Sequence, residues 1–300
     1  MSGTRPMDAA SIAAAVAERR CSARSVVTEA LARIERANPR VNAFTDVLGP
    51  RALGRADALD AALGMGIAAG PLAGVPFAVK NLIDIEGLPT RAGSKINRAY
   101  PPAQRDGALV RRLEAAGAIL VGGLNMGEYA YDFTGENVHD GDVHNPHALD
   151  RMTGGSSSGS GAAVAAGMVP LTLGSDTNGS IRVPAAFCGC FGLKPTYGRL
   201  SRAGSFPFVG SLDHLGPMAR SVTDLALAYD AMHGPDPDDP VATPRAPEPV
   251  MPDLESDIGG LRIAVAGGYF ARGGDPDAFA AVTRVAEALG AERSVELPEA

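Results

Sequence analysis

Two short segments rich in glycine and serine, residues 154–160 and 176–182, restrict the fold of this chain more than any other feature. The apolar run Ala162–Leu173 joins them. By composition alone, the first segment is typical of a flexible linker. Because it leads directly into a helix-like apolar run, we interpret it as a turn attached to a packed core. The two segments therefore present Ser156 and Ser180 in glycine-rich turns.

A third segment, residues 74–81, carries Lys80 at the end of a short apolar stretch. Burial disfavours the charged form of a lysine and lowers its pKa, so a buried lysine can act as a base. A serine hydroxyl needs such a base to become a nucleophile. Consecutive backbone N–H groups in a tight turn, as expected for Thr177–Ser180, can hold the oxyanion that then forms. The three segments predict an acyl-transfer site that needs no histidine.

The composition argues against several other classes of protein. The chain has 300 residues, of which 45% are hydrophobic, enough for one large domain or two smaller ones. A net charge of −7 without a long block of like charge disfavours direct binding of nucleic acid. No apolar run is long enough to span a membrane, and the charged first helix-like stretch does not resemble a signal peptide. Three cysteines make no disulfide framework, so we expect a reduced, cytoplasmic protein.

Helical and strand-like patterns alternate along the chain, which predicts a mixed α/β architecture around a central sheet. The second helix is expected to stop at Asn38-Pro39. Residues 235–252 contain 7 prolines and are expected to form an exposed connection. The expected helices are residues 7–19, 25–37, 53–63, 106–116, 162–167, 222–233 and 277–289, and the expected strands are residues 74–79, 118–121, 169–173, 261–266 and 293–297.

Taken in order, these segments resemble the amidase signature family. The resemblance spans nearly the whole chain and is most specific between residues 74 and 220. It implies an α/β amidase signature fold, in which helices cover both faces of a mixed central β-sheet. It also implies a single amidase domain over residues 1–300 that lacks the C-terminal part of the fold. The matching motifs are residues 74–80, 124–128, 145–146, 154–159, 174–185 and 192–198.

The resemblance also implies catalytic roles. Ser180 is expected to be the nucleophile that forms an acyl-enzyme, and Lys80 the base. Ser156, which follows a cis peptide bond from Gly155 in this family, is expected to bridge the two. No metal or cofactor is implied. The expected oxyanion donors are the backbone N–H groups of Thr177, Asn178, Gly179 and Ser180.

Two positions depart from the family pattern. Family members commonly carry glycine where this chain has Asn178, and an acidic residue where it has Gly127. Asparagine tolerates left-handed backbone conformations, so the turn can survive the first change. Its side chain would then reach towards the substrate. We expect Gly127 and Asn178 to lie at substrate-binding positions.

Other residues near these motifs allow competing interpretations. His139, His144 and His147 lie near two aspartates but match no zinc spacing, so we expect no metal site there. No Gly-Lys-Ser/Thr sequence follows either glycine-rich turn, which argues against a phosphate-binding module. Asp176 and Arg182 are expected to pair across the serine turn as a structural support.

The family includes enzymes with different substrates. Residues 133–144, 178–180 and 205–208 are most similar to the 1-carboxybiuret hydrolase group, which cleaves small urea-like amides. That similarity implies a small-molecule amide substrate and a small helical partner subunit, and we also expect a homo-oligomer without a membrane partner. The alternative is the glutaminase (A) subunit of the tRNA-dependent amidotransferase, which shares residues 196–199 and 211–213.

Overall fold

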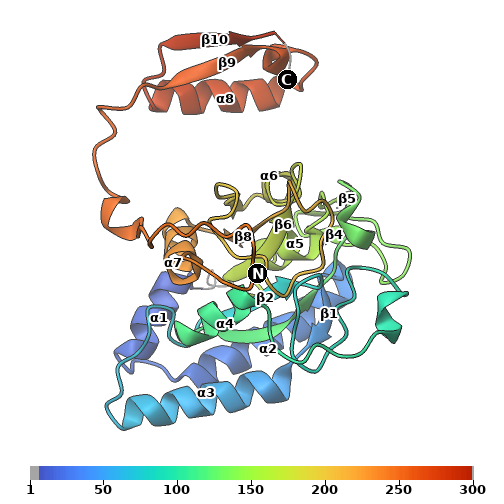
Figure 1. The fold of residues 1–300 in the computed structure, drawn as a ribbon, viewed down its shortest axis with the longest axis vertical. Coiled ribbons are helices and arrows are strands. Elements are labelled where there is room, and N and C mark those ends of the chain that lie inside the picture. Colours follow the sequence, from blue (N-terminus) through green and yellow to red (C-terminus); the bar gives the residue numbers. More distant parts are fainter. Residues whose placement is uncertain (1–6, 299–300) are drawn as a thin grey trace. The chain divides into compact units, whose positions relative to one another are not determined.

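The structure, a computed structural model, describes residues 7–298 and divides into two compact units (Figure 1). The first unit ends at Leu254 and the second begins at Glu255. All the residues expected to form the site lie in the first unit. The expected single amidase domain over the whole chain stays a prediction.

The first unit is built on a six-stranded mixed sheet with the strand order β1-β3-β2-β6-β8-β7. The central strands β3, β2 and β6 run parallel, and the outer pairs are antiparallel. Every residue of these central strands is buried, which requires cover on both faces of the sheet. The expected α/β fold with a covered, mixed sheet is confirmed. The strands are β1 (Phe44–Val47), β2 (Pro76–Lys80), β3 (Ile119–Leu124), β6 (Leu171–Asp176), β7 (Phe191–Gly192) and β8 (His214–Ala219).

Helices pack around this sheet (Figure 1). Helix α2 (Ala23–Val41) contacts β1, β2 and β3. Helix α5 (Ser158–Ala165) contacts β2, β6 and β8, and helix α7 (Val222–Met232) contacts β8. No helix in the described part of the chain is both long and apolar enough to cross a membrane. The helices are α1 (Ala9–Ala17), α2 (Ala23–Val41), α3 (Gly49–Gly64), α4 (Ala108–Ala115), α5 (Ser158–Ala165), α6 (Arg182–Cys188) and α7 (Val222–Met232), with short 3-10 helices η1 (Asn97–Ala99), η2 (Glu128–Ala130) and η3 (Met251–Asp253) and a hairpin of β4 (His144–Asn145) and β5 (Ala148–Met152).

Several element boundaries differ from those expected. The α2 helix continues through Pro39 to Val41 instead of stopping before the proline. Pro39 lacks the N–H that would bond to the carbonyl four residues earlier, and its ring crowds that carbonyl, so the helix continues for only two residues beyond it. The strands β1 and β8 and the helix α6 were not expected. Gly216 and Pro217 lie inside β8, and both residue types are unusual in a strand. The sequence pattern therefore did not predict β8.

Two of these differences in element boundaries lie at the edge of the sheet next to the serine turns. The strand β6 reaches Asp176 instead of ending at residue 173, and α5 begins at Ser158 instead of residue 162. Because β2 and β6 are parallel, Lys80, the last residue of β2, and Ser175, the residue before the last of β6, lie at the same edge of the sheet. In α/β proteins, ligands bind at this carboxyl edge of the parallel strands.

The second unit is a small β-α-β arrangement. It contains β9 (Ala264–Gly268), η4 (Tyr269–Ala271), α8 (Pro276–Ala288) and β10 (Arg293–Leu297), and β9 pairs in parallel with β10. These elements agree with the expected strand, helix and strand. Residues 235–250, in the preceding connection, contain no helix or strand, and most are exposed, although Asp239 is buried.

Candidate active site

Lys80 ends β2 with its side chain fully buried. Its Nζ lies 2.6 Å from Ser156 Oγ and 2.9 Å from Ser175 Oγ. Burial lowers the pKa of this amine to about 7. The carboxylates of Asp132, Asp176 and Asp213 raise this pKa and oppose the effect of burial only in part. The amine therefore loses its proton near neutral pH and can act as a base.

Ser156 lies in the bend that leads into α5, and its side chain is buried. The peptide bond between Gly155 and Ser156 is cis, in agreement with the expectation from the family resemblance. The backbone N–H of Gly127 donates to the Ser156 carbonyl over 3.2 Å. The structure thus brings Lys80 and Ser156 into direct contact.

Ser180 lies in the turn between β6 and α6, which is organised by Asp176. The buried Asp176 carboxylate accepts the N–H groups of Gly179 and Ile181 at 2.7 and 3.1 Å. The guanidinium of Arg182 donates two further hydrogen bonds to it, which confirms the expected pair. Burial alone would raise the pKa of Asp176, but these donors outweigh it and hold the pKa below its usual value. The turn is therefore anchored by a carboxylate that remains charged.

The four expected oxyanion donors are not equivalent. The N–H of Gly179 points to Asp176, as described above. Across residues 7–298, no hydrogen bond engages the N–H groups of Thr177, Asn178 or Ser180. These three groups are available to a ligand, because backbone donors in such a turn can bind an anion together.

A cleft of about 360 Å³ opens beside Ser180. The cleft is lined by Ala130, Tyr131, Asp132, Phe133, Thr177, Asn178, Ser180 and Phe208.

The two serine turns touch, since the N–H of Ser157 donates to the Ser180 carbonyl over 3.2 Å. Within the described residues, however, no hydrogen bond joins Ser156 Oγ to Ser180 Oγ, so the second link of the expected chain is not formed in this conformation.

The structure places the two expected substrate-binding positions differently. Asn178 lines the cleft and is exposed. Gly127 does not line it; instead, Asp132 Oδ2 lies 1.4 Å from the point where a Cβ on Gly127 would be. The volume of a side chain at residue 127 is thus filled by the carboxylate of Asp132, which does line the cleft.

Two residues of this site escaped the sequence analysis. Ser175 contacts Lys80 but is one of several serines near the turn, and only the length of β6 brings it to the amine. Asp132 is revealed only by its packing against Gly127. The glycine at residue 127, where the family commonly has an acidic residue, was the one available signal.

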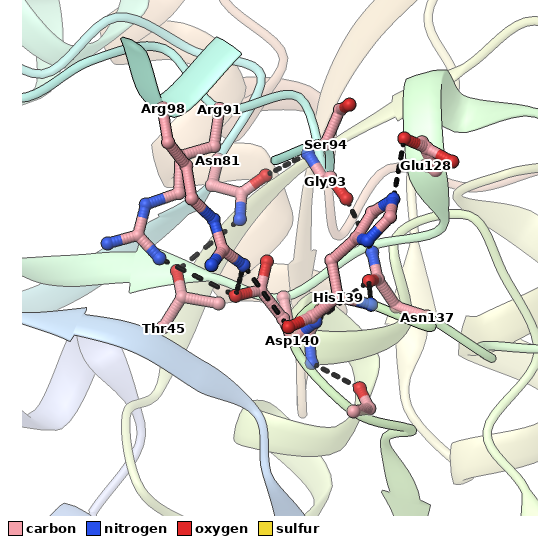
Figure 2. Close-up of polar contacts among 12 residues, drawn as sticks. Thr45, Asn81, Arg91, Gly93, Ser94, Arg98, Glu128, Asn137, His139 and Asp140 are labelled. Atoms are coloured by element: carbon pink, nitrogen blue, oxygen red, sulfur yellow. Dashed lines mark hydrogen bonds and ion pairs between the residues drawn. The ribbon is translucent and has the colours of Figure 1, made fainter. Parts of the chain in front are cut away.

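The histidines near these motifs make ordinary hydrogen bonds. His139 contacts Glu128 at 2.9 Å in a polar network that includes Asn137, Asp140 and Arg98 (Figure 2). His147 contacts the Cys188 carbonyl. Among the described residues, no group of three or more potential ligand side chains could hold a metal ion.

Comparisons with known proteins identify the family. The sequence matches the Amidase family over residues 25–299. AtzE of Pseudomonas sp. (strain ADP), which is a 1-carboxybiuret hydrolase subunit, is 58% identical over 285 residues, which are 95% of this chain and 62% of that protein. The A subunit of the Glutamyl-tRNA(Gln) amidotransferase of Anaeromyxobacter dehalogenans (strain 2CP-C) is 45% identical over 269 residues, which are 90% of this chain and 54% of that protein.

A solved structure agrees with these sequence matches. It is described as an unexpected vestigial protein complex that reveals the evolutionary origins of an s-triazine catabolic enzyme. It superposes with a TM-score of 0.97 at 57% identity, covering 98% of this chain and 64% of its own. The chain therefore spans between 54% and 64% of the length of these relatives. Because the match extends over nearly the whole chain and includes the fold, this chain belongs to the amidase signature family.

Proposed function

We propose that this protein hydrolyses a carbon–nitrogen bond of a small urea-like amide such as 1-carboxybiuret, using Lys80, Ser156 and Ser180. The observation that carries the proposal is the buried Lys80 amine, which lies 2.6 Å from Ser156 Oγ and whose pKa is lowered to about 7. The Ser180 turn, anchored by Asp176, adjoins this pair and opens into a cleft. A base, a bridging hydroxyl and a nucleophile with nearby N–H donors are the components that acyl transfer requires.

The proposed reaction has two halves. Neutral Lys80 takes the Ser156 proton while Ser156 takes the Ser180 proton, and Ser180 Oγ forms a bond to the amide carbonyl carbon. The free N–H groups of the 177–180 turn stabilise the oxyanion. The proton then returns through Ser156 to the leaving nitrogen as the C–N bond breaks. Water repeats the sequence on the acyl-enzyme and releases the acid and Ser180. No step requires a metal or cofactor.

The substrate class rests on similarity and on the cleft. AtzE, named as a 1-carboxybiuret hydrolase subunit, is more similar to this chain than the amidotransferase protein is. A cleft of about 360 Å³ with the exposed Asn178 amide on its wall suits a compact molecule with hydrogen-bonding groups. The structural relative described as a vestigial complex supports a partner subunit for this protein too. A homo-oligomer and a cytoplasmic location remain predictions.

The test combines labelling with a substrate comparison. A serine-directed fluorophosphonate followed by mass spectrometry is expected to modify Ser180. Release of ammonia from biuret-type amides, and not from glutamine, supports the proposal. Ammonia from glutamine alone would assign the protein to the amidotransferase glutaminases, to which 45% identity also points. Modification of a different serine would contradict the catalytic assignment.

The pH dependence of turnover follows from the Lys80 pKa. Only the neutral amine can accept a proton, and its pKa is lowered to about 7. We expect kcat/KM to rise with pH to a plateau above the pKa, and to be about 100-fold lower two pH units below it. Initial rates at constant ionic strength check this. A profile that falls as the pH rises through 7 would show that the charged amine is required.

Replacement of Ser175 by alanine should impair the base without removing it. Ser175 Oγ accepts a hydrogen bond from Lys80 Nζ, which directs the lone pair of the neutral amine towards Ser156. We expect Ser175→Ala to lower kcat about 10-fold with little change in KM. Steady-state kinetics measure both constants. The control is Ser160→Ala, a buried serine that donates to the Leu173 carbonyl, and an equal loss in both variants would assign the effect to packing.

A further inference from the structure

The carboxylate of Asp132 lies directly beside the bridging serine. A Cβ on Gly127 would lie 1.4 Å from Asp132 Oδ2, and a Cβ on Gly155 would lie 2.9 Å from Asp132 Oδ1. Gly155 precedes Ser156, and the N–H of Gly127 donates to the Ser156 carbonyl. Only glycine at both positions leaves room for the carboxylate, which therefore packs against the backbone on either side of Ser156.

The two oxygens of this carboxylate have different surroundings. Oδ1 accepts the N–H and the hydroxyl of Thr134 at 2.7 and 2.9 Å, and the N–H of Gly135 at 2.9 Å. Oδ2 is buried and has no hydrogen-bond partner within residues 7–298. A buried carboxylate oxygen without a partner is costly, because it has lost water and gained nothing in exchange. Its charge is also poorly screened.

The other charged groups around Lys80 are compensated. Asp176 is paired with Arg182 and accepts backbone N–H groups. Asp213 accepts the hydroxyl of Thr177 and the N–H groups of the 208–209 segment, so both of its carboxylate oxygens have donors. Of the three carboxylates that act on Lys80, Asp132 alone has an oxygen without a donor in the described chain.

We propose that Asp132 is a positioning residue whose carboxylate stabilises the ammonium that forms on Lys80 when the Ser180 proton arrives through Ser156. This inference rests on the proposed function. The proton moves from Ser180 Oγ to Ser156 Oγ and from Ser156 to Lys80 Nζ, while Ser180 Oγ bonds to the carbonyl carbon. Positive charge thus appears on Lys80 during each acylation, and a fixed negative charge with one uncompensated oxygen favours that state. Asp132 is also the foremost of the carboxylates that raise the Lys80 pKa against the effect of burial.

The experiment measures the rate at which a fluorophosphonate labels Ser180, as a function of pH, in the full chain. Asp132→Asn keeps the shape of the side chain and the Oδ1 acceptor but removes the charge. We expect the plateau rate to fall about 10-fold and the rising limb to move to lower pH, since the Lys80 pKa drops when the anion is removed. A loss of rate without movement of the limb would mean a structural role and would overturn the proposal.

Two further variants make the result specific. Asp142→Asn is the matched control, because this exposed carboxylate accepts the N–H of Asn137 in the same stretch and does not act on Lys80. Its profile should equal that of the wild type. The double variant Gly127→Asp/Asp132→Gly returns a carboxylate to the same volume from the other position, and it should restore both the limb and most of the rate. If Asp132→Asn does not fold, the double variant alone decides. A pH profile of labelling equal to that of the wild type supports the proposal, and a profile whose rising limb is shifted overturns it.

The outcomes also separate this inference from the proposed function. If the wild-type protein is not labelled at Ser180, the catalytic assignment itself fails. If Ser180 is labelled and Asp132→Asn has an unchanged pH profile, the catalytic assignment stands and only the role of Asp132 is lost.

Discussion

Replacing Ser180 by alanine is expected to lower kcat/KM for the amide substrate by at least about 10,000-fold. Without its hydroxyl, no acyl-enzyme can form, and the remaining oxyanion donors and cleft can only bind the substrate. The fold should be retained, since Ser180 contributes its backbone to the contact with Ser157 and its side chain makes no hydrogen bond in the described structure. Steady-state kinetics measure the loss, and fluorophosphonate labelling should disappear in parallel.

The matched control for this variant is Ser158→Ala. Ser158 is a buried serine of the neighbouring glycine-rich segment, and its hydroxyl makes only a long, 3.5 Å contact with the Asn125 carbonyl. We expect it to retain activity within a few-fold of the wild type. Ordinary turnover by Ser180→Ala, or a comparable loss in Ser158→Ala, would contradict the assignment of the nucleophile.

Replacing Lys80 by methionine is the second change with a large expected effect. Methionine fills nearly the same volume but has no basic nitrogen, so Ser156 cannot pass its proton on. We expect kcat/KM to fall by at least about 10,000-fold, because in a catalytic triad loss of the base costs about as much as loss of the nucleophile. The residual rate should also lose the rise centred near pH 7, because the group that titrates there is gone. Rates across the pH range measure both effects.

Folding must be measured in the same variant. The amine of Lys80 contacts two buried hydroxyls, and methionine leaves them without this partner. The expected change in the free energy of unfolding is about 1–3 kcal/mol, too small to unfold a domain of ordinary stability. Urea denaturation measures it. Lys95→Met, at an exposed lysine, is the control and should preserve activity. Retention of the pH-dependent rise in Lys80→Met would refute the role of Lys80.

Local sequence was sufficient for much of this site. The apolar residues 74–79 predict a buried strand, so the lysine that follows was expected to be desolvated, as the structure confirms. The acid and the arginine on either side of the Ser180 turn were expected to pair, and Asp176 and Arg182 do so. These features depend on residues close together in the chain, where burial pattern, turn chemistry and charge are local properties. The catalytic roles themselves remain predictions from the family resemblance.

Other features depend on distant segments and could not be read locally. Patterns within one segment do not determine where a neighbouring strand ends. The contact between Ser175 and Lys80 therefore follows only from the pairing of β6 with β2 in the folded chain. The packing of the Asp132 carboxylate into the volume beside Gly127 could not be predicted either. A glycine in the sequence does not indicate which side chain occupies the space next to it.

The sequence by itself thus determined which groups are present, that the lysine is buried and that the serines lie in turns. Tertiary structure alone decided the distances between them, the hydroxyl that orients the amine and the carboxylate left without a partner beside Ser156. The physical reason is that burial and turn formation follow from short-range patterns. The electrostatic environment of a group depends instead on every element packed against it.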